Sequence, residues 1–167
     1  MQALTNLEVV QAWVAREADP LLQNNYKTIT ADGLTLRSYK MDIAVLVKTL
    51  YGEWAALVTN EDSSHTTINH RSLAMALLRK KDIPYYTVPS LHPGKENQGH
   101  LINVDYMLNE AAISDDLAER ARIYTNHHLE SASRMRDKAR AYANAFLTER
   151  EQVQAFRHLV ARKEPTS

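Results

Sequence analysis

The feature that most constrains the fold is a long helical pattern in the C-terminal part of the chain. Between residue 103 and Pro165 the sequence contains neither proline nor glycine, the two residues that most often interrupt helices. A short helix is predicted over residues 103–112, and Ser114 is placed to cap the helix that follows it. Thr148 can cap another helix, so we expect a break near residue 148.

Apolar side chains in this region recur at steps of three and four residues, which places them on one helix face. From Ala132 onward the steps alternate four and three, as in a coiled coil or a helical hairpin. We therefore predict a narrow apolar seam that is buried either within the chain or in a homodimer formed through the C-terminal helices. The seam comprises Met135, Ala139, Tyr142, Phe146, Val153, Phe156 and Val160.

The preceding part of the chain has the pattern of a smaller mixed domain. An amphipathic helix, capped by Thr5 or Asn6, is predicted from Leu7, Val10, Trp13 and Val14. Residues 26–59 predict a β-meander of four short antiparallel strands, because β-branched runs alternate there with turn residues. Further elements are predicted as a helix over 67–80, an edge strand over 84–88 and a loop over 89–101.

Together these elements predict an α+β fold. A small antiparallel β-meander packed with helices is followed by a long C-terminal helical hairpin or coiled-coil-like segment. We place the domain boundary where the composition changes, which gives an α+β domain over residues 1–101 and a helical region over residues 102–167. A chain of 167 residues is long enough to build a sizeable core.

Charge and composition narrow the functional classes. The 20 basic and 20 acidic residues cancel, which argues against a strongly acidic DNA mimic and against a strongly basic nucleic-acid coat. Because cysteine is absent, disulfides and thiolate metal sites are excluded. No apolar run approaches the roughly 20 residues that span a bilayer, and the N-terminus lacks a signal-peptide pattern. We expect a soluble, cytoplasmic protein without a membrane partner.

Hydroxyl and imidazole side chains gather between the predicted meander and the helix over 67–80. Thr66 or Thr67 is placed to cap this helix. With His70 and Arg71 they converge at a helix N-terminus, a place that suits an anion or an anionic partner. We favour the structural interpretation, in which the threonines only cap, His70 packs half-buried and Arg71 is solvated.

The same region carries a resemblance to a known family. The run Ser38-Tyr39, then Ile43-Ala44, then Ser64-x-Thr66-Thr67-x-x-His70 resembles small uncharacterised proteins encoded by phages, plasmids and archaeal mobile elements. The resemblance covers residues 34–71. It implies that the protein originates from a mobile element and is located in the cytoplasm of a host cell. It also adds Tyr39 to the candidate anion- or partner-binding residues. It implies no activity.

A histidine metal site is a less favoured interpretation. His65, His70, His92 and His100 are the candidate ligands. His65 and His70 are five residues apart, whereas ligands on one helix face are three or four apart, and no HExxH-like signature is present. We expect neither a metal nor a cofactor.

A basic face is predicted on the long C-terminal helix. Its residues repel one another at i,i+4 spacing unless an anion or an acidic partner neutralises them, so the face is a candidate contact for phosphates. The alternative is a solvated face with acids supplied by other helices. The face comprises Arg134, Arg136, Lys138 and Arg140.

Three functions compete. The favoured one is a non-catalytic accessory protein of a phage or mobile element that binds and occludes a host protein or ribonucleoprotein, for example as an inhibitor of a CRISPR or other defence complex. The first alternative is a nucleic-acid-binding protein that uses the basic face. The second is an enzyme acting on a phosphoester through Thr66, Thr67, His70 and Arg71. No phosphate-binding loop or serine elbow supports the enzyme.

Overall fold

The computed structural model describes residues 4–61, 63–96 and 98–163, with side-chain surroundings as far as residue 157. The chain forms two compact units, Met1–His92 (unit 1) and Pro93–Ser167 (unit 2). Unit 1 is a mixed sheet with helices and unit 2 is helical, so the fold is α+β, as predicted. The boundary between the units precedes the predicted one, which lies inside the first helix of unit 2.

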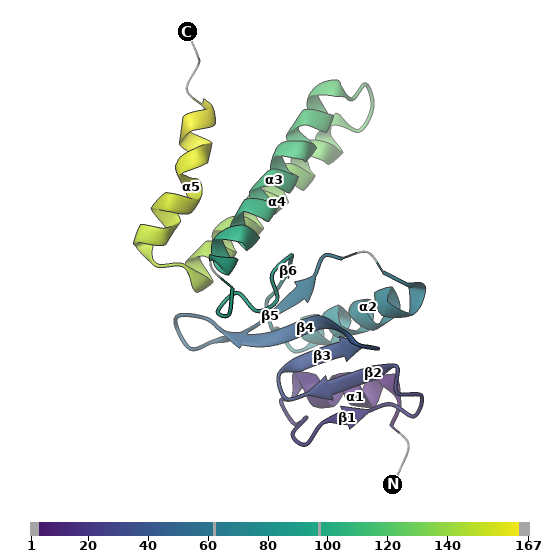
Figure 1. Ribbon diagram of the computed structural model, residues 1–167. Helices are drawn as coiled ribbons and strands as arrows, with labels where there is room; N and C mark the ends of the chain where they lie inside the picture. Colours follow the sequence, from purple (N-terminus) through teal and green to yellow (C-terminus); the bar gives the residue numbers. More distant parts are fainter. Residues whose placement is uncertain (1–3, 62, 97, 164–167) are drawn as a thin grey trace. The chain divides into compact units, whose positions relative to one another are not determined.

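Unit 1 is built on one six-stranded sheet (Figure 1). The strands are ordered β1-β2-β3-β4-β5-β6 and are antiparallel, except that β6 pairs with β5 in parallel. The chain between β5 and β6 forms a helix, the connection that parallel neighbours require. In chain order the elements are α1 (Asn6–Val14), β1 (Leu22–Gln23), β2 (Ile29–Asp32), β3 (Thr35–Ser38), β4 (Met41–Lys48), β5 (Trp54–Thr59), α2 (His65–Lys80) and β6 (Tyr85–Val88).

The sequence pattern accounts for most of this unit. The four predicted strands of the meander are β2 to β5, and β6 is the predicted edge strand. Gly33 and Gly52 form the tight turns with positive φ angles of 59° and 79°, a region that glycine enters at little cost. Strand β1 was not predicted, because two residues are too few to show an alternation.

The two helices of unit 1 pack with the sheet and with each other. Thr5 caps α1 in a capping box with Glu8. Trp13 is fully buried and donates a hydrogen bond from Nε1 to the carbonyl oxygen of Leu34 at 2.8 Å. This bond ties α1 to the β2–β3 turn. The prediction that Leu7 belongs to the buried stripe is wrong, because Leu7 is exposed while Val9 is buried.

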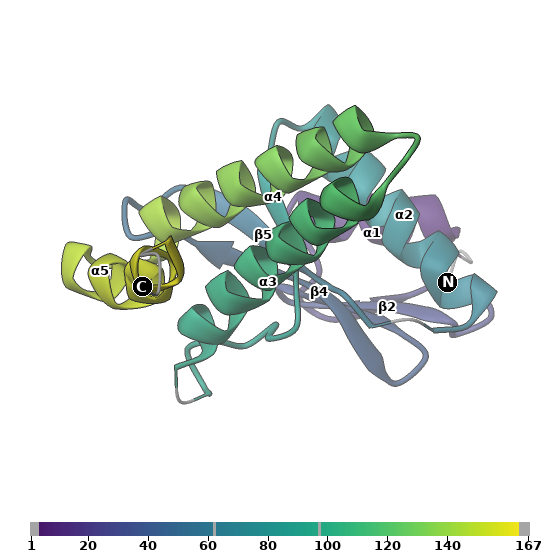
Figure 2. The same ribbon diagram turned by 90° about the horizontal axis from the view of Figure 1, so that it is seen from above.

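Unit 2 contains three helices, α3 (Gly99–Arg120), α4 (Thr125–Phe146) and α5 (Glu149–Lys163). Helices α3 and α4 lie side by side as a hairpin in both views of the molecule (Figures 1 and 2). The predicted helix end before Ser114 is wrong, since Ser114 lies inside α3. The chain turns instead just before α4, where Tyr124 has a φ angle of 68°.

The predicted break near residue 148 is confirmed. Helix α4 ends at Phe146, and Thr148 and Glu151 form the reciprocal bonds of a capping box for α5. The Thr148 N–H donates to Glu151 Oε1 at 3.0 Å, and the Glu151 N–H donates to Thr148 Oγ1 at 3.3 Å.

The predicted seam is buried as far as the end of α4. Its α4 members are buried in the hairpin or, for Met135, half-buried. Beyond the break, Val153 is 71% exposed and Phe156 is half-buried, while the Val160 side chain lies outside the described surroundings. The single chain therefore covers the α4 part of the seam and leaves Val153 uncovered. The buried members of α4 are Ala132, Ala139, Tyr142, Ala143 and Phe146.

The helices give no indication of a membrane span. Among the described residues, no helix combines the length and the apolar character that crossing a bilayer requires.

Candidate functional site

The polar cluster predicted at the start of α2 is a buried hydrogen-bond network. Ser38, at the end of β3, places its Oγ 2.8 Å from Thr67 Oγ1 and 2.8 Å from His70 Nδ1. The exposed fractions of these residues are 1% for Ser38, 4% for Thr67 and 2% for His70. The cluster therefore joins the third strand to α2 inside unit 1.

The helix cap is two residues earlier than predicted. Ser64 is the N-cap of α2, and its Oγ accepts a hydrogen bond from the Thr67 N–H at 3.3 Å. The prediction that Thr66 or Thr67 caps is therefore wrong. Thr67 therefore lies in the first turn of α2, and its hydroxyl lies 2.8 Å from Ser38 Oγ.

The network has a consistent direction of proton donation. Ser64 Oγ donates to Thr67 Oγ1 at 3.2 Å. The Thr67 hydroxyl can then donate to Ser38 Oγ, and the Ser38 hydroxyl to His70 Nδ1. An accepting Nδ1 requires a neutral imidazole. Burial favours the same state, because it lowers the pKa of His70.

This shift links the network to pH. A histidine whose folded-state pKa lies below its unfolded value takes up protons preferentially on unfolding. Its contribution to stability is therefore fully present above the ordinary pKa of 6.5 and is lost as the pH falls below it. The burial of all three residues, the hydrogen bonds of Ser38 to Thr67 and His70, and the lowered pKa of His70 identify the Ser38–Thr67–His70 cluster as part of the core of unit 1.

Arg71 and Tyr39 lie beside this network and do not join it. The Arg71 Nη1 donates to the carbonyl oxygens of Thr59 and Glu61, each at 3.2 Å, and so ties α2 to the end of β5. Tyr39 follows Ser38 in the chain and is 53% exposed. The structure thus brings Thr67 and His70 together with Ser38, and directs Arg71 to the backbone rather than to a shared anion site.

Ser38 is the member that sequence reasoning did not include among the candidates. Alternation along β3 places Ser38 on the same face as the buried Leu36. A buried serine on the core side of a strand needs a hydrogen-bond partner. This requirement is the signal in the sequence that could have indicated a hydroxyl or imidazole partner on the helix that covers the strand.

The basic face of α4 is partly neutralised within unit 2. Arg136 Nη1 lies 2.6 Å from Asp115 Oδ2 of α3, so a phosphate would have to replace an existing ion pair at this position. Arg134, Lys138 and Arg140 are exposed. The acid that neutralises Arg136 comes from the neighbouring helix, as the structural alternative to a phosphate-binding face requires.

The four histidines considered as metal ligands lie in separate surroundings. His65 is exposed, His70 belongs to the Ser38 network, and His100 places Nδ1 2.7 Å from the Tyr142 hydroxyl. His92 pairs with Asp42. Within the described part of the chain, no three residues of metal-binding type are grouped to hold an ion.

A second charged cluster, not predicted from the sequence, lies on β3 and β4. Asp42 accepts from Arg37 Nε at 2.8 Å and lies 2.9 Å from His92 Nε2, while Arg37 Nη1 also contacts Asp32 at 3.0 Å. Burial alone would raise the pKa of Asp42, but the hydrogen bonds from His92 and Arg37 together lower it. The cluster keeps Asp42 ionised and ties His92, four residues beyond the end of β6, to β4.

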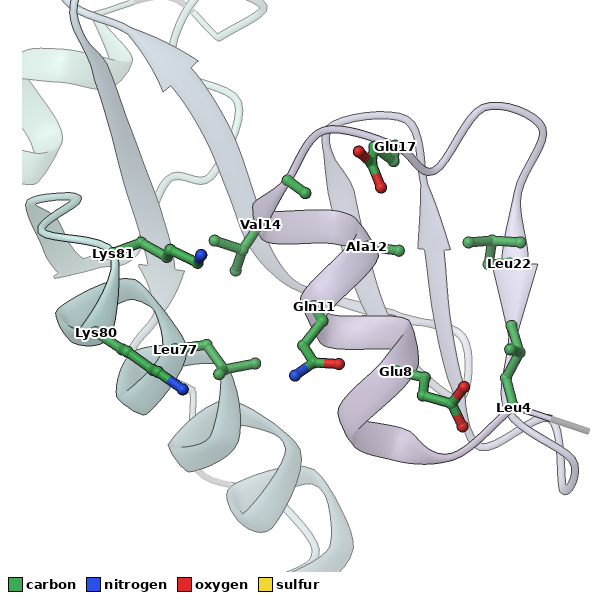
Figure 3. A pocket seen from close by; sticks show the side chains of 11 residues that line it. Leu4, Glu8, Gln11, Ala12, Val14, Glu17, Leu22, Leu77, Lys80 and Lys81 are labelled. Atoms are coloured by element: carbon green, nitrogen blue, oxygen red, sulfur yellow. The ribbon is translucent and has the colours of Figure 1, made fainter.

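A groove crosses the outer face of α1 (Figure 3). Leu77 and Lys80 of α2 and the following Lys81 stand on one side of α1, and Leu4 and Leu22 stand on the other. Glu8 and Glu17 also line it, so opposite charges meet in one open groove. This mixed lining selects no single class of ligand.

Large apolar side chains are exposed along one face of the hairpin. On α3, Ile102, Ile113 and Leu117 are 44%, 48% and 45% exposed. Their spacing places them on one face, away from the α3 residues buried in unit 2, which include Val104, Met107 and Ala111. Ile123 and Tyr124 continue the apolar surface into the α3–α4 turn, at 70% and 73% exposure. We call these five residues the hairpin stripe.

Fold and site together define a two-unit α+β protein with a buried network in unit 1 and an uncovered apolar stripe on unit 2. The chain matches no protein-family model, no curated protein and no solved structure.

Proposed function

We propose that the chain is a non-catalytic binding protein that docks on a partner protein through the hairpin stripe. The observation that carries the proposal is the exposure of five large apolar side chains within 23 consecutive positions, residues 102–124. Exposed apolar patches mark interaction sites in soluble proteins. A few buried residues, most often Trp, Tyr and Arg, supply most of the affinity of an interface, and Tyr124 is a residue of such a type.

The charge of α3 indicates which partner the stripe fits. Helix α3 carries five carboxylates, from Asp105 to Glu119, and one arginine, Arg120. Asp115 and Asp116 are already paired with Arg136 and Arg120. Asp105 and Glu110 flank the stripe at helical spacing, which favours a partner whose apolar contact residues are bordered by lysine and arginine. Such a partner associates faster at low ionic strength, because opposite charges steer the encounter.

The resemblance of residues 34–71 to proteins of mobile elements supports placing the partner in a host cell. A host defence protein or ribonucleoprotein, occluded by the bound hairpin, is the partner class that this origin favours. The phosphoester alternative fits the geometry less well. Thr67 and His70 are buried and bonded to Ser38, so neither is presented to a substrate.

The proposal is tested with a variant that removes the stripe and leaves the fold intact. Ile113→Gln with Leu117→Gln keeps good helix formers at two exposed positions. Losing the burial of two large aliphatic side chains in an interface should weaken partner binding about tenfold or more. The measurement is capture from nuclease-treated bacterial and archaeal lysates, with the captured protein quantified against the wild-type chain.

The matched control is Leu50→Gln, which changes a 56% exposed leucine in unit 1. It should capture the same protein at the wild-type level. Equal capture by the Ile113→Gln/Leu117→Gln chain, or a wild-type catch that disappears with nuclease, contradicts docking through the hairpin stripe.

A further inference from the structure

Two Tyr–Lys dipeptides stand side by side at one end of the sheet of unit 1. Tyr26-Lys27 lies in the turn between β1 and β2, and Tyr39-Lys40 lies in the turn between β3 and β4. Because β2 and β3 pair at Ile29 and Ser38, the two turns are neighbours. The Tyr39 N–H donates to the Thr28 carbonyl oxygen at 2.8 Å, which fixes one turn to the other. We call these four residues the paired Tyr–Lys turns.

The buried side chain of Asn24 holds the turn between β1 and β2 through hydrogen bonds. Asn24 is 5% exposed, and its Oδ1 accepts from the Thr28 N–H at 2.8 Å and from the Ile29 N–H at 3.1 Å. Its Nδ2 donates to Asn6 Oδ1 and to Thr28 Oγ1, each at 2.7 Å. The turn is therefore anchored to the start of α1, and Tyr26 is presented on a rigid support at 82% exposure.

Both dipeptides contain a residue in the left-handed region of backbone space. Lys27 and Tyr39 each have a φ angle of 56°, a conformation that costs free energy for residues other than glycine and that asparagine or aspartate adopts more readily. Gly33 and Gly52 adopt this conformation at two other turns, and Arg16, Asp82, Gln98 and Tyr124 are further non-glycine residues with positive φ angles. Strain of this kind is retained where the surroundings enforce it and often marks a functional position.

The acidic residues of β2 and β4 are paired with basic side chains. Asp42, at the start of β4, is paired with Arg37 and His92, and Asp32 is paired with Arg37. Lys27 and Lys40 are exposed. The end of the sheet thus presents two exposed aromatic rings and two exposed ammonium groups on a preorganised frame.

We propose that the paired Tyr–Lys turns bind single-stranded nucleic acid. Two bases stack on Tyr26 and Tyr39, and the phosphates between and beside them contact Lys27 and Lys40. The combination of exposed aromatic rings with cations is the one that single strands require, because unstacked bases need a ring and their backbone needs positive charge. Adjacent hairpins set the two turns about 10 Å apart, two strand spacings, so one short strand spans both. The paired Tyr–Lys turns belong to unit 1, whereas the hairpin stripe and the basic face of α4 belong to unit 2.

The test measures the binding of a fluorescent oligothymidine and an oligouridine of about 12 nucleotides by anisotropy. The wild-type chain binds the single strands more tightly than a duplex of equal length. In Tyr26→Ala/Tyr39→Asn, asparagine keeps the left-handed conformation, and the affinity falls about tenfold or more. In Lys27→Asn/Lys40→Gln, the negative slope of log affinity against log salt becomes shallower by about 1.4 between about 50 and 200 mM salt, because two phosphate contacts are lost.

Two controls locate the effect. Tyr51→Ala changes a tyrosine that is 78% exposed in the β4–β5 turn at the opposite end of the sheet, and it binds as the wild type does. Arg134→Gln/Arg140→Gln also binds as the wild type does. The proposal is overturned if the wild-type chain binds no single strand at low salt, or if the Tyr26→Ala/Tyr39→Asn chain retains full affinity. A loss confined to the arginine variant assigns binding to α4 and likewise overturns it.

Discussion

Replacing His70 by alanine is expected to destabilise unit 1 by about 3 kcal/mol. The change removes a fully buried ring and leaves a cavity, and it also leaves the Ser38 hydroxyl without the acceptor at His70 Nδ1. Both tryptophans, Trp13 and Trp54, belong to unit 1. Urea unfolding followed by tryptophan fluorescence therefore reports this unit without interference from unit 2.

The control is His65→Ala on the first turn of the same helix. His65 is exposed, so its loss should change the free energy of unfolding by no more than about 0.5 kcal/mol. A His70→Ala chain as stable as His65→Ala would mean that the Ser38–Thr67–His70 cluster does not support the core. The residue would then have to be examined as part of a binding site.

Replacing Phe146 by aspartate is expected to destabilise unit 2 by roughly 3 kcal/mol or more. Phe146 is 6% exposed, lies 4.7 Å from the Tyr142 ring between centroids, and stacks on His100 at 5.2 Å. A carboxylate in this place would be buried without a partner, which is among the costliest single changes. Thermal unfolding followed by far-UV circular dichroism measures the loss, since helices dominate this unit.

Val153→Asp is the matched variant, because both positions belong to the predicted seam and only Phe146 is buried. Val153 is 71% exposed, so the change should shift the free energy of unfolding by no more than about 0.5 kcal/mol. Equal damage from Val153→Asp would show that something covers α5. A halved mass in solution would then identify that cover as a second copy of the chain.

The elements that sequence predicts best here are those with a repeated pattern. The alternating strands β2 to β5 and the edge strand β6 follow from side-chain periodicity and turn residues. The break at Thr148 follows from a capping box whose partners are three residues apart. In each case the residues that determine the element lie within a few positions of one another, so the element can be predicted from the local sequence.

The elements that sequence predicts poorly depend on contacts between distant residues. Ser38 and His70 are 32 residues apart, and Asp42 and His92 are 50 residues apart. The serine at position 114 looks like a helix cap in the sequence, yet packing of α3 along α4 carries the helix past it to Arg120. Packing outweighs a local capping preference of about 1 kcal/mol.

The most direct test of docking through the hairpin stripe is site-specific photo-cross-linking in the captured complex. A photoreactive amino acid is placed at Leu117 in one sample and at Leu50 in the other, since both side chains are exposed to a similar degree. Docking through the hairpin stripe predicts a covalent adduct with the captured protein from position 117 and none from position 50. An adduct from position 50 with none from position 117 would contradict it, because the partner would then contact unit 1 and leave the hairpin stripe uncovered.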